Sequence, residues 1–208
     1  MKIAAQMTVP QRKFLGFCED VESFARGCDE GNEVVGFTSG QFSIIDVISS
    51  VLSRLGGGSL VLSTWTAAGA ELDHVMEFID SELVKNVRWI VDRSFQNRQP
   101  ALCLKMRNSF GDESIRVQRV HCKFALVHNG KKGVTIQTSA NLNKNARIEN
   151  VSVSSCPVLF SAYSELVEEI FETQMPQVGF ESSSFVTHSF NKVVGKKKRR
   201  ERANPWSK

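Results

Sequence analysis

Short apolar runs alternate with segments of helical spacing along most of the chain. Residues 33–40, 59–65 and 87–94 are apolar runs rich in Val, Ile and Leu, which predict strands. The segments 42–55 and 72–84 carry apolar residues three and four apart, which predicts helices. The glycine run 56–58 is predicted to form a turn that ends the first of them. Apolar runs without polar alternation are typical of parallel strands that are buried on both faces. The pattern therefore predicts an α/β fold with a mixed sheet flanked by helices.

The second half of the chain changes rhythm. A short helix is expected over 100–108, and a strand over 115–120 is expected to lead directly into a strand at His121. Two further strands, 133–137 and 147–153, follow closely, and a helix is expected over 160–171. The closeness of these strands predicts an antiparallel ribbon added to the sheet.

The two ends of the chain differ from the main domain, which we place at 33–175. Residues 1–32 are predicted to be an N-terminal extension with one helix between Arg12 and Arg26. Its apolar stripe would consist of Phe14, Phe17, Val21 and Phe24, three and four residues apart. Residues 176–208 lose periodicity and form a predicted flexible tail.

Length and composition indicate the number of domains and the cellular compartment. The length of 208 residues suits one domain, and no apolar run approaches the roughly 18 residues that cross a membrane. The N-terminus lacks an apolar signal-peptide region, so we expect a cytoplasmic protein without membrane contact. Its odd number of cysteines favours reduced thiols; a Cys18–Cys28 disulfide is the alternative. The cysteines are Cys18, Cys28, Cys103, Cys122 and Cys156.

The net charge of +4 is concentrated in the tail. Residues 191–208 hold eight Lys or Arg and one acid, so they carry +7 and leave about −3 for the rest. Such a tail suits contacts with nucleic-acid phosphates, and a solubilising tail is the alternative. The residues predicted to contact nucleic acid are Lys196, Lys197, Lys198, Arg199, Arg200 and Arg202.

Candidate chemistry gathers between residues 121 and 153. His121 and Lys123 are two apart, so on a strand their side chains leave the same face. The next strand leads into Thr138, Ser139 and Asn141, and the third carries Glu149. A nucleophile or acid, a cation, neutral donors and a carboxylate suit phosphoryl transfer. The alternative is an ordinary ribbon with a solvated polar face.

These residues resemble the motif of the phospholipase D superfamily, His-x-Lys-x4-Asp followed by Gly-Ser-x-Asn and a Glu. The chain departs from the motif twice, with His128 at the Asp position and Thr138 at the Gly position. The tyrosyl-DNA phosphodiesterase branch similarly lacks the Asp and has a Thr-Ser-Asn run. The resemblance, closest to the single-motif endonucleases, implies a phospholipase D-like α-β-α sandwich. His128 would either replace the structural hydrogen bonds of the Asp or be an ordinary polar residue at a strand end.

The resemblance also implies roles for the residues. His121 would attack phosphorus in one subunit and act as general acid and base in the other, with no cofactor or metal. Lys123 and Asn141 would bind phosphate oxygens with support from Ser139, and Glu149 would orient a histidine. Because the chain holds a single His-x-Lys pair, a complete site requires a homodimer.

Three functions are compatible with this pattern. The leading interpretation is a phosphodiesterase that cleaves DNA or RNA, in the manner of an endonuclease. A catalytically silent nucleic-acid-binding protein on the same fold is the second. A lipid phosphodiesterase is the third, and the small size and basic tail disfavour it.

Overall fold

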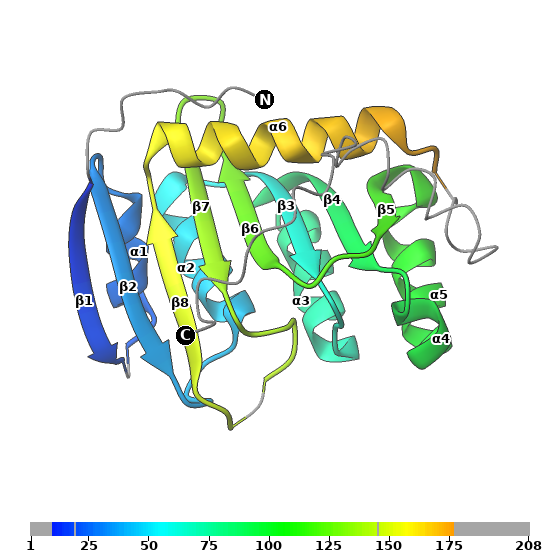
Figure 1. The fold of residues 1–208 in the computed structure, drawn as a ribbon, viewed down its shortest axis with the longest axis horizontal. Helices are drawn as coiled ribbons and strands as arrows, with labels where there is room; N and C mark the ends of the chain where they lie inside the picture. The colour runs from blue at the N-terminus through cyan, green and yellow to red at the C-terminus, as the bar shows by residue number, and fades with distance from the viewer. Residues whose placement is uncertain (1–9, 19, 145, 177–208) are drawn as a thin grey trace, which may run out of the picture.

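A computed structural model describes residues 10–18, 20–144 and 146–176, and in it one mixed sheet of eight strands runs through the molecule (Figure 1). The strand order is β1-β2-β8-β7-β6-β3-β4-β5, and only β6 and β8 run against the other six. The strands are β1 Gln11–Phe17, β2 Asn32–Thr38, β3 Gly58–Thr64, β4 Val84–Asp92, β5 Ile115–Gln118, β6 Lys123–His128, β7 Gly133–Thr138 and β8 Glu149–Ser154.

Helices cover both faces of this sheet. One face packs against α1 to α5 and holds the larger core, in which Trp89, Ile48 and Leu72 are fully buried. The other face is crossed by α6 alone, over a smaller core that includes Phe124 and Val167 (Figure 1). The helices are α1 Glu22–Ala25, α2 Ile44–Leu55, α3 Gly69–Asp80, α4 Phe95–Arg98, α5 Pro100–Phe110 and α6 Pro157–Thr173, with 3-10 turns η1 Arg26–Cys28 and η2 Asp112–Ser114. The predicted α/β architecture is confirmed.

The helix α2 shows how local sequence sets these boundaries. Ser43 accepts a hydrogen bond from the Asp46 amide at 3.3 Å, and the Asp46 carboxylate accepts one from the Ser43 amide at 2.7 Å. This reciprocal capping box satisfies two amides that the first turn leaves unpaired. The helix ends where Gly56 adopts the left-handed conformation, with φ of 72°. The predicted stop at the glycine run is therefore confirmed.

The prediction of a helix between Arg12 and Arg26 is wrong over its first half. Residues 11–17 form β1, an edge strand parallel to β2, and only α1 and η1 are helical in this segment. Gly16 has φ of 67°, and the register shifts between Phe14 and Phe17. Such a bulge puts two residues three apart on one side of a strand, and both phenylalanines contact Phe37. The bulge thus imitates a helical spacing.

The two strands expected over 115–120 and from His121 are present as β5 and β6, but they lie at different places in the sheet. β5 pairs with β4 at one edge of the sheet, whereas β6 pairs with β3 and β7 in its interior. Residues 119–122 cross from one position to the other without strand structure. The antiparallel strands β6, β7 and β8 are confirmed, and they lie between β2 and β3 in the centre of the sheet.

All five cysteines are free, and Cys122 alone among them is exposed. In the described ranges, no helix combines the length and apolar character that crossing a membrane requires.

Candidate functional site

Polar residues from five neighbouring strands lie in a row across one end of the sheet, where these strands begin or finish. In the order β2-β8-β7-β6-β3, the residues are Thr38, Glu149, Thr138, Lys123 and Thr64. The register fixes the arrangement, because Thr38 pairs with Glu149 and Thr138 pairs with Lys123. Residues that are widely separated in sequence thus lie on adjacent strands in the interior of the sheet. Each of these strands is hydrogen-bonded to a neighbouring strand on both sides.

His121 lies just before β6, and its side chain meets Lys123. The Lys123 Nζ atom is 3.2 Å from Nδ1 and 3.3 Å from Nε2 of the imidazole. If Nζ lay in the ring plane at nearly equal distances from the two ring nitrogens, it would overlap Cε1. The Lys123 ammonium therefore lies over the face of the ring. Lys123 therefore leaves the in-plane direction of each ring nitrogen clear. This arrangement combines an exposed imidazole with an adjacent cation.

Glu149 is held at the start of β8 by Ser139. The Ser139 hydroxyl donates a short hydrogen bond to Glu149 Oε2 and accepts one from the Asn150 amide at 3.1 Å. Because its single proton points to the carboxylate, Ser139 orients Glu149 in this structure. Glu149 accepts from Ser139, while His121 contacts Lys123, and among the described residues no histidine is hydrogen-bonded to this carboxylate.

Thr138, at the motif's usual glycine position, shapes the turn that follows β7. Its hydroxyl donates to the Asn150 carbonyl at 2.8 Å and accepts from the Ala140 amide at 3.0 Å. These bonds join the end of β7 to β8 and lead the chain into Asn141. The Oδ1 atom of Asn141 is buried without a hydrogen-bond partner in the described residues. The Thr138 hydroxyl thus forms two hydrogen bonds that a glycine at this position could not form.

The electrostatics of Lys123 follow from its position. Partial burial lowers the pKa of Lys123 below its usual value, while the negative charges of Glu149 and Cys122 raise it. Burial is the largest of these effects, so the net change is a decrease. The carboxylate of Glu149 is thus near enough to Lys123 for its charge to act on the ammonium.

Two residues near the site were not predicted from the sequence: Trp65, which lies beside His121, and Arg98, which lies over the Trp65 ring. The indole centroid of Trp65 is 6.0 Å from the imidazole centroid, and the Arg98 guanidinium carbon lies 3.7 Å from the indole centroid. Trp65 follows the end of β3, and that position at the polar end of a buried strand was the one available signal. Arg98 lies 33 residues later in α4, and nothing in the sequence joins the two.

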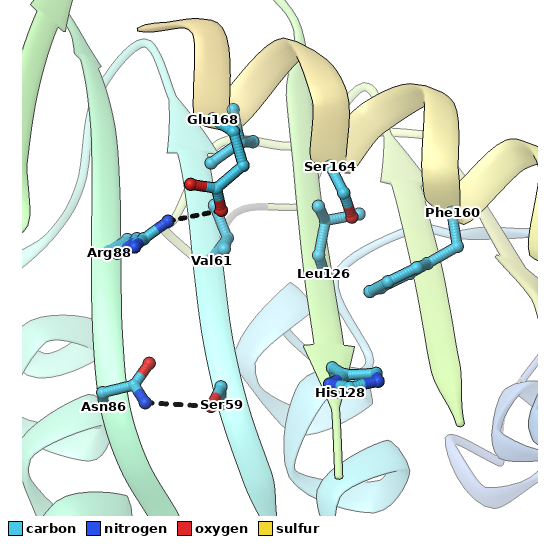
Figure 2. A pocket seen from close by; sticks show the side chains of 10 residues that line it. Ser59, Val61, Asn86, Arg88, Leu126, His128, Phe160, Ser164 and Glu168 are labelled. Carbon is cyan, nitrogen blue, oxygen red and sulfur yellow. Dashed lines mark hydrogen bonds and ion pairs between the residues drawn. The ribbon is translucent and has the colours of Figure 1, made fainter. Parts of the chain in front are cut away.

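His128 lies at the opposite end of β6, roughly 16 Å along the strand from Lys123. Its ring stacks on Phe160 of α6 with centroids 5.6 Å apart, and its Nδ1 accepts from the Gly130 amide at 3.3 Å. Figure 2 shows it beside a cavity of about 320 Å³ between α6 and the sheet, which the Arg88–Glu168 ion pair borders. His128 therefore takes no part in the His121 site.

Other expectations concern the tail and metals. Lys196, Lys197, Lys198, Arg199, Arg200 and Arg202 lie outside the described residues. Among the residues that the structure describes, no three His, Cys, Asp or Glu side chains gather closely enough to hold a metal ion.

Comparison with known proteins supports the fold. The sequence matches no protein-family model and no curated protein. The structure is similar to NucT from Helicobacter pylori, with a TM-score of 0.50 and 13% identity over 69% of this chain and 99% of NucT. This similarity confirms the predicted phospholipase D-like fold.

Two larger proteins are similar at lower scores. Polyphosphate kinase from Porphyromonas gingivalis has a TM-score of 0.49 and 16% identity over 70% of this chain. Phosphatidylserine synthase from Haemophilus influenzae Rd KW20 has a TM-score of 0.48 and 15% identity over 78% of this chain. The matched region spans 27% of the kinase and 46% of the synthase.

Proposed function

We propose that this protein is a phosphodiesterase that cleaves nucleic acid through a phosphohistidine intermediate. The observation that carries the proposal is the Lys123 ammonium over the His121 imidazole, beside the Ser139–Glu149 pair, at one edge of a phospholipase D-like sheet. A nucleophile, a phosphate-binding cation and an oriented carboxylate are the groups that a two-step displacement at phosphorus requires.

In the first step a ring nitrogen of His121 attacks phosphorus, and a P–N bond forms as the P–O bond to the leaving strand breaks. A second imidazole gives the leaving oxygen its proton. Negative charge develops on the non-bridging oxygens, where Lys123 and the amide of Asn141 would bind them. The position of Lys123 over the ring places its charge close to the attacking nitrogen.

In the second step the other imidazole removes a proton from water, the resulting oxygen attacks phosphorus, and the P–N bond breaks. This returns His121 to its starting state and leaves a phosphate monoester on one strand. The residues supply all proton transfers, so this sequence of steps needs no cofactor or metal.

The second imidazole is proposed to be His121 of the partner subunit. The single chain brings one imidazole to the site, and the other described histidines, His74 on α3 and His128 at the far end of β6, lie elsewhere. A homodimer with a twofold axis through the site would face two His121 side chains across one phosphate. Glu149 would then accept a hydrogen bond from the imidazole of the opposite subunit and fix its tautomer.

Nucleic acid is the proposed substrate because of the tail. Its six clustered Lys and Arg residues between 196 and 202 suit phosphate contacts that hold a strand near the site. The free cysteines fit a reducing compartment, and we propose that the protein acts in the cytoplasm.

The test is incubation of the full chain with end-labelled DNA and RNA strands in excess EDTA, beside His121→Ala. We expect the unmodified protein alone to cleave. Binding of both proteins without cleavage by either would leave the silent nucleic-acid-binding protein as the function. Cleavage of a phospholipid headgroup and not of either nucleic acid would favour the lipid phosphodiesterase.

A further inference from the structure

Arg98 is an exposed guanidinium whose position is fixed beside the His121 site. Its Nη2 donates to the Trp65 carbonyl at 2.7 Å, and its Nε donates to the Ser94 hydroxyl at 3.1 Å. The guanidinium carbon lies 3.7 Å from the Trp65 ring centroid, so one face of the cation is covered by the indole. Arg98 as a whole is exposed to solvent.

This cation lacks the carboxylate partner that four other described arginines have. Arg12, Arg54, Arg88 and Arg107 each form an ion pair with a carboxylate. In the described part of the chain no carboxylate forms an ion pair with Arg98. Asp92 is linked to Arg98 through Ser94, which donates to Asp92 and accepts a hydrogen bond from Arg98. A guanidinium has five N–H groups, and those that do not contact Ser94 or Trp65 are available to a ligand.

A chain of hydrogen bonds ties Arg98 to the catalytic histidine. Asp92 Oδ1 accepts from the amide and hydroxyl of Ser94, which holds Arg98. The other oxygen of Asp92 accepts from the Val120 amide at 3.2 Å, directly before His121. The position of Arg98 is therefore set by the same carboxylate that holds the backbone next to the nucleophile.

The loop that carries Trp65 is tied to the opposite side of the site. The Ala68 amide donates to the Leu142 carbonyl at 2.7 Å, and the Leu142 amide donates to the Thr66 carbonyl at 3.2 Å, next to Asn141. Thr66 also donates to Gln99 Oε1 at 2.7 Å, beside Arg98. The indole and the guanidinium are thus positioned before any ligand arrives, which lowers the entropic cost of binding one.

We propose that Trp65 and Arg98 form a stacking subsite for an unpaired base of a nucleic-acid strand, next to the phosphate held at His121. Bases stack on arginine planes and on aromatic rings in single-strand recognition, and every base has a face that fits. The base lies on the open face of Arg98, and the indole supports the guanidinium from behind. This inference rests on the proposed function and specifies its substrate as strands with accessible bases.

The test measures binding, so that it stays separate from turnover. His121→Ala protein is titrated with a labelled oligothymidylate and with an abasic oligomer of equal length and charge. We expect the thymidylate to bind about tenfold more tightly. Adding Trp65→Ala or Arg98→Ala removes this preference while binding of the abasic oligomer changes little. Trp65→Phe retains most of the preference, because it keeps an aromatic face.

Arg88→Ala is the matched control. Arg88 also lies over an aromatic ring, 4.9 Å from the centroid of Phe171, but it is paired with Glu168 on the face that α6 covers. Its loss should leave the preference for bases intact. Equal binding of the two oligomers, or a preference that survives both Trp65→Ala and Arg98→Ala, would overturn the subsite. Lack of cleavage by the unmodified protein would refute the proposed function, whereas the measured preference for bases would remain valid.

A second measurement avoids changing the subsite. Trp89 is fully buried, so in a His121→Ala, Trp206→Phe protein Trp65 is the tryptophan that reports on a bound strand. Oligothymidylate should alter its fluorescence and the abasic oligomer should not. Identical responses to both oligomers would count against the subsite.

Discussion

The two ends of β6 carry a histidine each and have opposite characters. His121, before the strand, contacts Lys123 and lies beside the Trp65 ring, among polar groups from five strands. His128, at the end of the strand, stacks on Phe160 and caps a turn with its ring nitrogen. A histidine's environment therefore depends on the neighbours that the sheet register supplies, and a sizeable cavity can lie away from the proposed reacting site.

The largest expected effect separates the two histidines directly. His121→Ala should lower turnover at least about a thousandfold, because it removes both the nucleophile and the acid of the proposed dimer. His128→Ala should change turnover by less than about threefold. Initial rates with a labelled strand in EDTA measure both. A similar loss in the two variants would show that the ends of β6 do not differ in function.

The next effect concerns the cation at the site. Lys123→Ala should lower kcat/KM about a hundredfold, since charge on the phosphate oxygens loses its closest cation. The pKa of Lys123 is lowered by burial, so the free protein loses this charge below the usual 10.5 of a lysine as the pH rises.

The pH profile of kcat/KM tests that direction. We expect its alkaline limb to begin below pH 10.5 and to move upward in Lys123→Arg, because a guanidinium stays charged. A limb that is unchanged in Lys123→Arg would assign the titration to another group. Circular dichroism across the same range checks that the fold is retained.

A smaller effect is expected from alkylation of Cys122. This thiol is exposed between His121 and Lys123, whereas burial raises the pKa of Cys28 and of Cys103 to about 11. Iodoacetamide at neutral pH should therefore modify Cys122 first and lower activity about tenfold by crowding the imidazole. Cys122→Ser should resist this inactivation, which peptide mass spectrometry and rates would follow together. Equal inactivation of Cys122→Ser would contradict it.

The smallest effect on turnover is expected at the other end of the strand. Phe160→Ala removes a ring that contacts His128 and packs on the smaller core, so it should destabilise the fold by about 2 kcal/mol. Turnover of the remaining folded protein should change less than twofold. Urea unfolding and rates measure the two quantities. A large loss of turnover in folded protein would mean that the two ends of the sheet are coupled.

Much of this fold follows from pattern, and the failures have physical causes. Regular spacing and a glycine stop identified α2 because its cap is encoded locally by Ser43, Asp46 and Gly56. β1 was missed because a bulge at Gly16 gave an edge strand the spacing of a helix. The separate places of β5 and β6 in the sheet depend on which strands pair, and local sequence does not determine this tertiary pairing.

The site divides in the same way. His121, Lys123, Ser139 and Glu149 lie within 29 consecutive residues, and two short turns bring them together, so the motif predicted their closeness. Trp65 and Arg98 join them only through β3 and α4, and no spacing rule connects these segments. Neighbours of a motif that are distant from it in sequence can therefore be identified only from the structure.

The decisive step of the proposed mechanism is transfer of the phosphoryl group to His121. The most direct measurement is intact-protein mass spectrometry of a reaction quenched during turnover, followed by peptide mapping. We predict a covalent nucleotide adduct on the peptide that contains His121, formed equally by His128→Ala and absent from His121→Ala. Strand cleavage without such an adduct, or an adduct on another residue, would contradict the claim.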